Sequence, residues 1–237
     1  MRNRNLVTLV TLAVAIVLGS GMALADNLNL GGNYNGGINI TGGYLGTGTA
    51  SEGGGSIGPS KLNGIALPYV YCVDIPDTVN VPQDYSNAVV TNNGMIAGSS
   101  NNNGKGGLTG YTTDGALATV NNAVAVAWLV HTFGAGASGY DAQVGLQAAI
   151  WNQIYGVSLT SSNTAGAIAD YTADLAALAA AGSLPNYESQ FAWLSPNGTN
   201  PNVMQGLITK VPDGGMTLML LGGTLVGLGT LRRKFRV

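Results

Sequence analysis

Residues 140–155 read YDAQVGLQAAIWNQIY, and this stretch decides the fold class because its apolar residues recur with the period of an α-helix. We expect the helix to begin after Gly139 and to run to about Tyr155. One face of it carries a polar residue, Gln147, among apolar neighbours: Val144, Ile150, Trp151 and Ile154. A primary amide buried there without partners costs about 1–3 kcal/mol. Gln147 therefore needs either hydrogen bonds to nearby backbone or a chemical role.

Helical periodicity is confined to the second half of the chain. Further helices are predicted over 118–133 and 164–181, whereas residues 65–74 are β-branched and aromatic enough to form a strand. Residues 26–60 are rich in glycine and asparagine, which is typical of either a flexible leader or edge strands. The order predicts a single α+β domain. In it, a β-rich N-terminal part, sandwich- or barrel-like, packs against a small helical bundle.

The N-terminus has the three parts of a secretory signal peptide. Arg2 and Arg4 precede an apolar run over 6–18, and Ala-Leu-Ala at 23–25 is a cleavage site of the A-x-A type. An uncleaved membrane helix is the alternative, but the run is short and the cleavage site follows at the right distance. We therefore expect residues 1–25 to be removed and the rest to be exported.

The C-terminus carries a second apolar run, over residues 216–231, which ends in a basic cluster: Arg232, Arg233, Lys234 and Arg236. Apolar residues followed by basic ones predict a membrane segment whose tail stays inside. Its sixteen residues are fewer than the ~20 that a stable span needs. This favours transient insertion over permanent anchoring. Directly before the run stands a short motif: Val211, Pro212, Asp213, Gly214 and Gly215.

This order of motif, short apolar helix and basic tail resembles the PEP-CTERM sorting segment in its VPDGG variant, over residues 211–237. The resemblance implies a bacterium with a Gram-negative type envelope and processing by an exosortase. It also implies release or attachment at the cell surface or in the extracellular matrix. An ordinary C-terminal membrane anchor is the alternative, and it would leave the main domain outside as well.

The composition excludes several classes of function. The 237 residues carry a net charge of −2 and only 8% charged side chains, so no basic surface is available to track nucleic-acid phosphates. The sequence holds no Cys/His cluster at metal-ligand spacing, and no cofactor is predicted. With 46% hydrophobic residues the chain can still build a core. This profile suits a polar, uncharged extracellular protein.

The single cysteine, Cys72, lies in Tyr71-Cys72-Val73-Asp74 on or just after the predicted strand. A lone cysteine in an exported chain cannot form an intramolecular disulfide. It can bridge to another molecule, remain a reactive thiol or bond to another kind of group within the chain.

Two motifs taken together favour the last option. Tyr71 precedes Cys72, and far along the chain comes a hydrophobic-Gln-x-x-hydrophobic-Trp pattern: Leu146, Gln147, Ile150 and Trp151. This pair resembles the bacterial thioester domain family, over roughly residues 61–208. The helix expected over 118–133 resembles the segment between the motifs in that family.

The resemblance implies a thioester between Cys72 and Gln147 that covalently captures an amine or hydroxyl on a target surface, as bacterial adhesins do. Such attachment happens once per molecule, so the protein would not be an enzyme. Trp151, one turn after Gln147, is the candidate for shielding the bond from water. The nucleophile-bearing partner is not identified by the sequence.

Two other classes stay open. One is a structural matrix protein with an inert buried cysteine. The other is a cysteine hydrolase that uses Cys72 and His131, the only histidine. His131 is also a candidate proton relay for the thioester reaction. Alternatively, it is a histidine at a helix end that interacts favourably with the helix dipole.

Overall fold

The computed structural model describes residues 26–34, 36–161, 163–198 and 203–210. The predicted signal peptide and sorting segment lie outside these residues. The strands are β1 (Asp26–Leu30), β2 (Gly36–Gly42), β3 (Thr49–Gly54), β4 (Ser60–Leu62), β5 (Ile65–Leu67), β6 (Tyr71–Cys72), β7 (Gln83–Thr91), β8 (Met95–Ala97), β9 (Leu108–Thr109), β10 (Leu117–Val120), β11 (Val157–Leu159), β12 (Phe191–Ser195) and β13 (Leu207–Lys210). The α-helices are α2 (Ala123–Phe133), α3 (Gly139–Tyr155) and α4 (Ala165–Ala180), and 3₁₀ turns cover Gly43–Leu45, Ser100–Asn102 and Glu188–Gln190.

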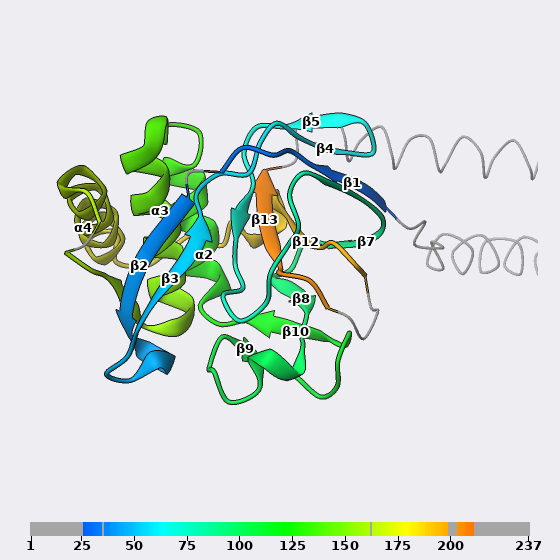
Figure 1. Cartoon of the computed structure of the whole chain (residues 1–237), viewed down its shortest axis with the longest axis horizontal. Helices are drawn as coiled ribbons and strands as arrows, with labels where there is room; N and C mark the ends of the chain where they lie inside the picture. The colour runs from blue at the N-terminus through cyan, green and yellow to red at the C-terminus, as the bar shows by residue number, and fades with distance from the viewer. Residues whose placement is uncertain (1–25, 35, 162, 199–202, 211–237) are drawn as a thin grey trace, which may run out of the picture.

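The expected α+β class is confirmed: strands form a curled sheet with smaller sheets beside it, and helices gather on one side (Figure 1). The largest sheet has the order β5-β4-β1-β7-β12-β13-β6, with antiparallel pairing throughout. Two three-stranded sheets, β8-β10-β9 and β11-β2-β3, complete the β structure of the described residues. The short strand β6, which carries Cys72, is an edge strand of the largest sheet.

Helix α3 links the helices to the sheets. It packs against α2 and α4 on one side and approaches β2 on the other (Figure 1). The helix ends at Gly156, whose φ of 70° is the left-handed conformation that commonly stops a helix. Residues 157–159 then form β11 and pair with β2. Within the described ranges, none of the helices combines the length and apolar character needed to cross a membrane.

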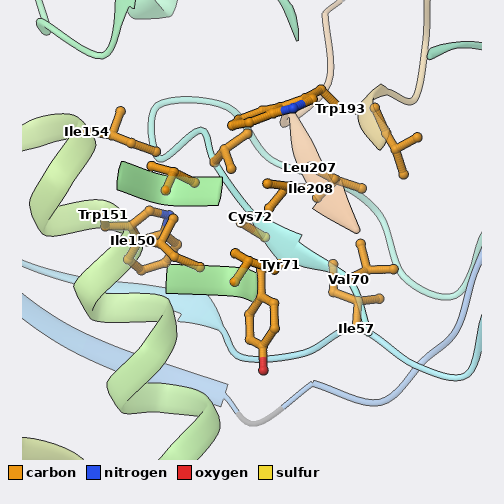
Figure 2. Close-up of a cluster of buried hydrophobic side chains, with 14 of the residues drawn as sticks. Ile57, Val70, Tyr71, Cys72, Ile150, Trp151, Ile154, Trp193, Leu207 and Ile208 are labelled. Carbon is orange, nitrogen blue, oxygen red and sulfur yellow. The ribbon is translucent and has the colours of Figure 1, made fainter. Parts of the chain in front are cut away.

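The core is shared by both halves of the chain. Buried hydrophobic side chains from the large sheet and from α2 and α3 belong to one connected cluster. Figure 2 shows Cys72 inside it, with Ile150 and Trp151 on one side and Trp193, Leu207 and Ile208 on the other.

Three expectations about local structure need correction. Of the two alternatives for residues 26–60, strands are observed, but β1 lies inside the largest sheet and not at its edge. The helix expected from 118 begins at Ala123, because Leu117–Val120 pair as β10 and Asn122 takes a left-handed φ of 53°. The strand expected over 65–74 is divided into β5 and β6.

Candidate functional site

Gln147 meets the backbone of Cys72 at the open edge of β6. The Cys72 N–H donates to Gln147 Oε1 at 2.9 Å, and Gln147 Nε2 donates to the Cys72 carbonyl oxygen at 2.7 Å. On its other side β6 pairs with β13, with Cys72 opposite Leu207. An edge strand leaves backbone groups without a strand partner, and here one side-chain amide takes both of them. The geometry explains how a glutamine can lie on the buried face of α3.

The sulfur of Cys72 faces a second amide. Its thiol donates to Gln205 Oε1 at 3.1 Å, and Gln205 Nε2 donates to the carbonyl oxygen of Asp74. Cys72 and Gln205 are 133 positions apart in the chain. The cysteine therefore lies between two glutamines, with Gln147 on its backbone and Gln205 on its side chain.

The helix side of this site is closed. Gln147 and Trp151 have no exposed surface, and Leu146 and Ile150 are equally buried. A Cβ added to Gly54 in β3 would lie 3.0 Å from Gln147 Cγ and 3.1 Å from Trp151 Cη2. The glycine lets the strand approach both side chains, and it places the indole ring beside the glutamine. The indole Nε1 of Trp151 is buried and has no hydrogen-bond partner in the described part of the chain.

Cys72 also borders a pocket of about 280 Å³. Cys72 and Gln205 line it, together with Glu52, Gly53 and Gly54 of β3 and the loop of residues 77–81. Tyr34 contributes to the pocket and is 51% exposed, so the lining reaches the surface there. A small molecule or a single side chain could reach the cysteine from this direction.

Two buried carboxyl groups follow Cys72. Asp77 accepts hydrogen bonds from Ser99 Oγ at 2.6 Å, from Asn101 Nδ2 at 2.8 Å and from Asn102 Nδ2 at 2.9 Å. Asp74 accepts from the Tyr155 hydroxyl at 3.1 Å. Burial and then the charge of Asp77 raise the pKa of Asp74 well above its usual range.

The same effects act on the cysteine. Burial, followed by the nearby Asp74, raises the pKa of the Cys72 thiol. Because the thiolate is the reactive form, the resting thiol is poorly reactive toward external reagents. Any reaction at this sulfur must proceed without a free thiolate building up.

His131 does not join the site. It lies at the exposed end of α2, where its ring stacks on Tyr187 with centroids 3.9 Å apart and planes 14° apart. It does not line the pocket at Cys72. The location fits a helix-end histidine and gives no support to a Cys72–His131 pair or a proton relay.

The structure brings Cys72, Gln147, Ile150 and Trp151 together, as the two motifs predict. The hydroxyl of Tyr71, which precedes the cysteine, is buried without a partner among the described residues.

Two residues near Cys72 were not predicted from the sequence, Gln205 and Glu52. Gln205 stands just before the apolar residues of β13, and a polar amide beside a buried strand is a signal that could have identified it. Glu52 lies in a glycine-rich stretch that gives no sign of a pocket. No group of three or more His, Cys, Asp or Glu side chains suited to a metal occurs in the described ranges.

No family model, no curated protein and no solved structure matches the chain. We therefore infer the function from the residues and their geometry.

Proposed function

We propose that Cys72 and Gln147 form an intramolecular thioester and that the exported protein uses it to attach covalently to a nucleophile on a target surface. The observation that carries this is the double hydrogen bond between the Gln147 amide and the Cys72 backbone. It holds the acyl carbon of Gln147 against the residue that bears the sulfur. Because the fold already holds the two groups close together, the reaction step does not bear the large entropic cost of bringing them together.

The hydrogen bonds also favour the chemistry. The Cys72 N–H at Gln147 Oε1 stabilises negative charge on that oxygen as the sulfur adds to the carbonyl carbon. The sulfur proton passes to the amide nitrogen, the C–N bond breaks and ammonia leaves. Rotation about the Cα–Cβ bond of Cys72 would turn the sulfur from Gln205 toward Gln147. The product is uncharged, so burial disfavours it far less than a thiolate.

A single attachment follows from the same chemistry. A nucleophile from another molecule adds to the acyl carbon, the C–S bond breaks and Cys72 regains its thiol. An amine leaves a stable amide on residue 147, so the protein is consumed and does not turn over.

The proposal extends to the rest of the chain. We propose that the β-rich part is sandwich- or barrel-like, that the signal over 1–25 directs export and that an exosortase processes the chain at 211–215. The mature protein is then located at the cell surface or in the matrix.

The test is the intact mass of the purified exported protein. The proposal predicts a deficit of one ammonia, no titratable thiol and recovery of the thiol after methylamine is added. Cys72→Ala and Gln147→Ala should each have the full mass of their sequence, whereas Gln205→Ala should keep the deficit. A full-mass wild-type protein with a free thiol contradicts the proposal.

One observation favours a second candidate, a structural matrix protein with an inert cysteine. The Gln147 amide already satisfies both free backbone groups of β6, which is a sufficient structural reason for its position. This candidate predicts a full-mass protein that stays unchanged in methylamine.

A further inference from the structure

The pocket beside Cys72 has an acidic lining. Glu52 and Asp77 both contribute to it, and no lysine, arginine or histidine does. Asp77 is held by three hydrogen-bond donors, whereas the Glu52 carboxylate forms no hydrogen bond with the other described residues. Glu52 is the carboxylate on this lining that is half-buried and not enclosed by neighbouring donors.

We propose that this pocket admits the attacking nucleophile as an alkylammonium group and that Glu52 binds the group and removes its proton. The inference rests on the proposed thioester and adds the route, the charge of the nucleophile and a residue that acts on it. A cavity lined by charge of one sign raises the local concentration of the opposite ion. A neutral hydroxyl group gains nothing from that field, so the pocket selects amines over alcohols.

The size of the pocket agrees with this assignment. A volume of about 280 Å³ lies just below the range of roughly 300–1,000 Å³ that is usual for small-molecule sites. It suits a narrow alkyl stem more than a sugar ring with its substituents. The exposed ring of Tyr34 at the mouth offers an aromatic face to such a stem or to its charge.

The surroundings of Glu52 make it able to exchange protons. Partial burial raises the pKa of Glu52, and Glu52 in turn contributes to the raised pKa of Tyr44 after burial of that phenol. The titratable groups around Glu52 and Tyr44 are Asp74, which also acts on Tyr44, Asp77 and Tyr34 on the pocket lining, and Lys105, whose Nζ lies 5.0 Å from the centre of the Tyr44 ring. Desolvation disfavours both the carboxylate and the ammonium, so proton transfer between them becomes easier than in water.

The reaction balances as follows. The ammonium loses one proton to Glu52, which releases it to solvent. The amine nitrogen adds to the acyl carbon of Gln147, and the C–S bond breaks. A second proton moves from nitrogen to the departing sulfur, and the last one stays on the new amide. The products are the amide, the Cys72 thiol and one proton in solution.

The test uses the full exported chain with its thioester, with methylamine and hydroxylamine as probes. Hydroxylamine is already uncharged at neutral pH and does not need Glu52 to lose a proton. Glu52→Gln should lower the rate of methylamide formation about 10- to 100-fold near neutral pH and leave the hydroxylamine rate unchanged. At strongly alkaline pH methylamine is already uncharged, so the methylamine rates of wild type and Glu52→Gln should converge. Glu188→Gln, the same change at the only other glutamate of the chain, should react like wild type.

Equal methylamine rates for wild type and Glu52→Gln overturn the inference, as does an ethanol adduct that forms as readily as the methylamide. If Glu52→Gln carries no thioester, wild type alone decides by a comparison of glycinamide with glycine. The two are compared at equal concentrations of the uncharged amine, because the amine of glycine is the more basic. The carboxylate of glycine should be repelled by the lining, so that glycine reacts at least about tenfold more slowly; equal rates contradict the proposal. A wild-type protein without a mass deficit refutes the proposed function itself, whereas a deficit with no preference for amines refutes only this inference.

Discussion

Cys72 lies between two regions that differ in almost every respect. On the helix side Gln147, Ile150 and Trp151 have no exposed surface, and among the described residues no charged side chain forms a hydrogen bond with Gln147. On the pocket side Glu52, Asp77 and Gln205 present polar groups to a cavity that reaches the surface. A protected bond and an approachable bond have opposite requirements. The difference teaches that one residue can meet both where a closed region and an open pocket adjoin the same two-residue edge strand.

The largest effect is expected from Gln147→Ala. The variant removes the acyl group, so we predict complete loss of the mass deficit and of any methylamine adduct. It also leaves the Cys72 N–H buried without the Gln147 oxygen that accepts its hydrogen bond, which should lower the free energy of unfolding by about 1–3 kcal/mol. Mass spectrometry and urea unfolding measure the two effects. Gln205→Ala is the matched control on the pocket side, and if it abolished the deficit while Gln147→Ala kept it, the roles of the two glutamines would be exchanged.

Trp151→Ala tests whether the helix side protects the bond. Truncation of a fully buried indole should cost about 3–5 kcal/mol of unfolding free energy. It should also let water reach the acyl carbon, so that the mass deficit decays faster by hydrolysis. Trp151→Phe keeps most of the volume and should be close to wild type in both measurements. A deficit that persists as long in Trp151→Ala as in wild type would show that the indole does not shield the bond.

Gly54→Ala tests the contact between β3 and the helix. The new methyl group would lie 2.6 Å from Ile38 Cδ1 and 3.0 Å from Gln147 Cγ. Overpacking of this kind costs about 1–3 kcal/mol, and it should also displace Gln147 and reduce the fraction of protein that carries the thioester. Gly53→Ala is the control, because its added methyl meets only Tyr34 Cε2 at 3.6 Å. Equal thioester fractions in the two variants would mean that Gly54 does not control the position of Gln147.

The smallest expected effect is a pH dependence of stability that comes from Asp174 on α4. Burial, and then the charge of Asp170, raises the pKa of Asp174 from 3.8 to about 7. In the unfolded chain this carboxyl group loses its proton at a lower pH than in the folded protein. The contribution of Asp174 to stability is therefore fully present below about pH 4 and is lost as pH rises to about 7. Asp174→Asn should remove this dependence and add about 1 kcal/mol at pH 8, after allowance for solvent screening. Thermal unfolding of both proteins from pH 4 to 8 measures it, and parallel curves would contradict the assignment.

Sequence reasoning succeeded where periodicity and local motifs carry the information. The α+β class and the extent of α3 follow from the pattern of apolar residues, and Cys72 and Gln147 were paired by two short motifs. It was wrong at residues 118–120, because Val120 fits a helical stripe as well as a buried strand position. It could not find Gln205 or Glu52, since their approach to Cys72 depends on pairing between strands distant in the chain. His131 drew attention as the only histidine, yet its ring is on the surface against Tyr187.

The central claim is that the acyl carbon of Gln147, and not that of Gln205, is bonded to Cys72. Methylamine treatment of the native protein, followed by proteolysis and tandem mass spectrometry, tests it directly. The account predicts an N-methylamide at residue 147, an unmodified glutamine at 205 and a newly alkylatable thiol at Cys72. A label at residue 205, or two unmodified glutamines with a thiol already free before treatment, would contradict it.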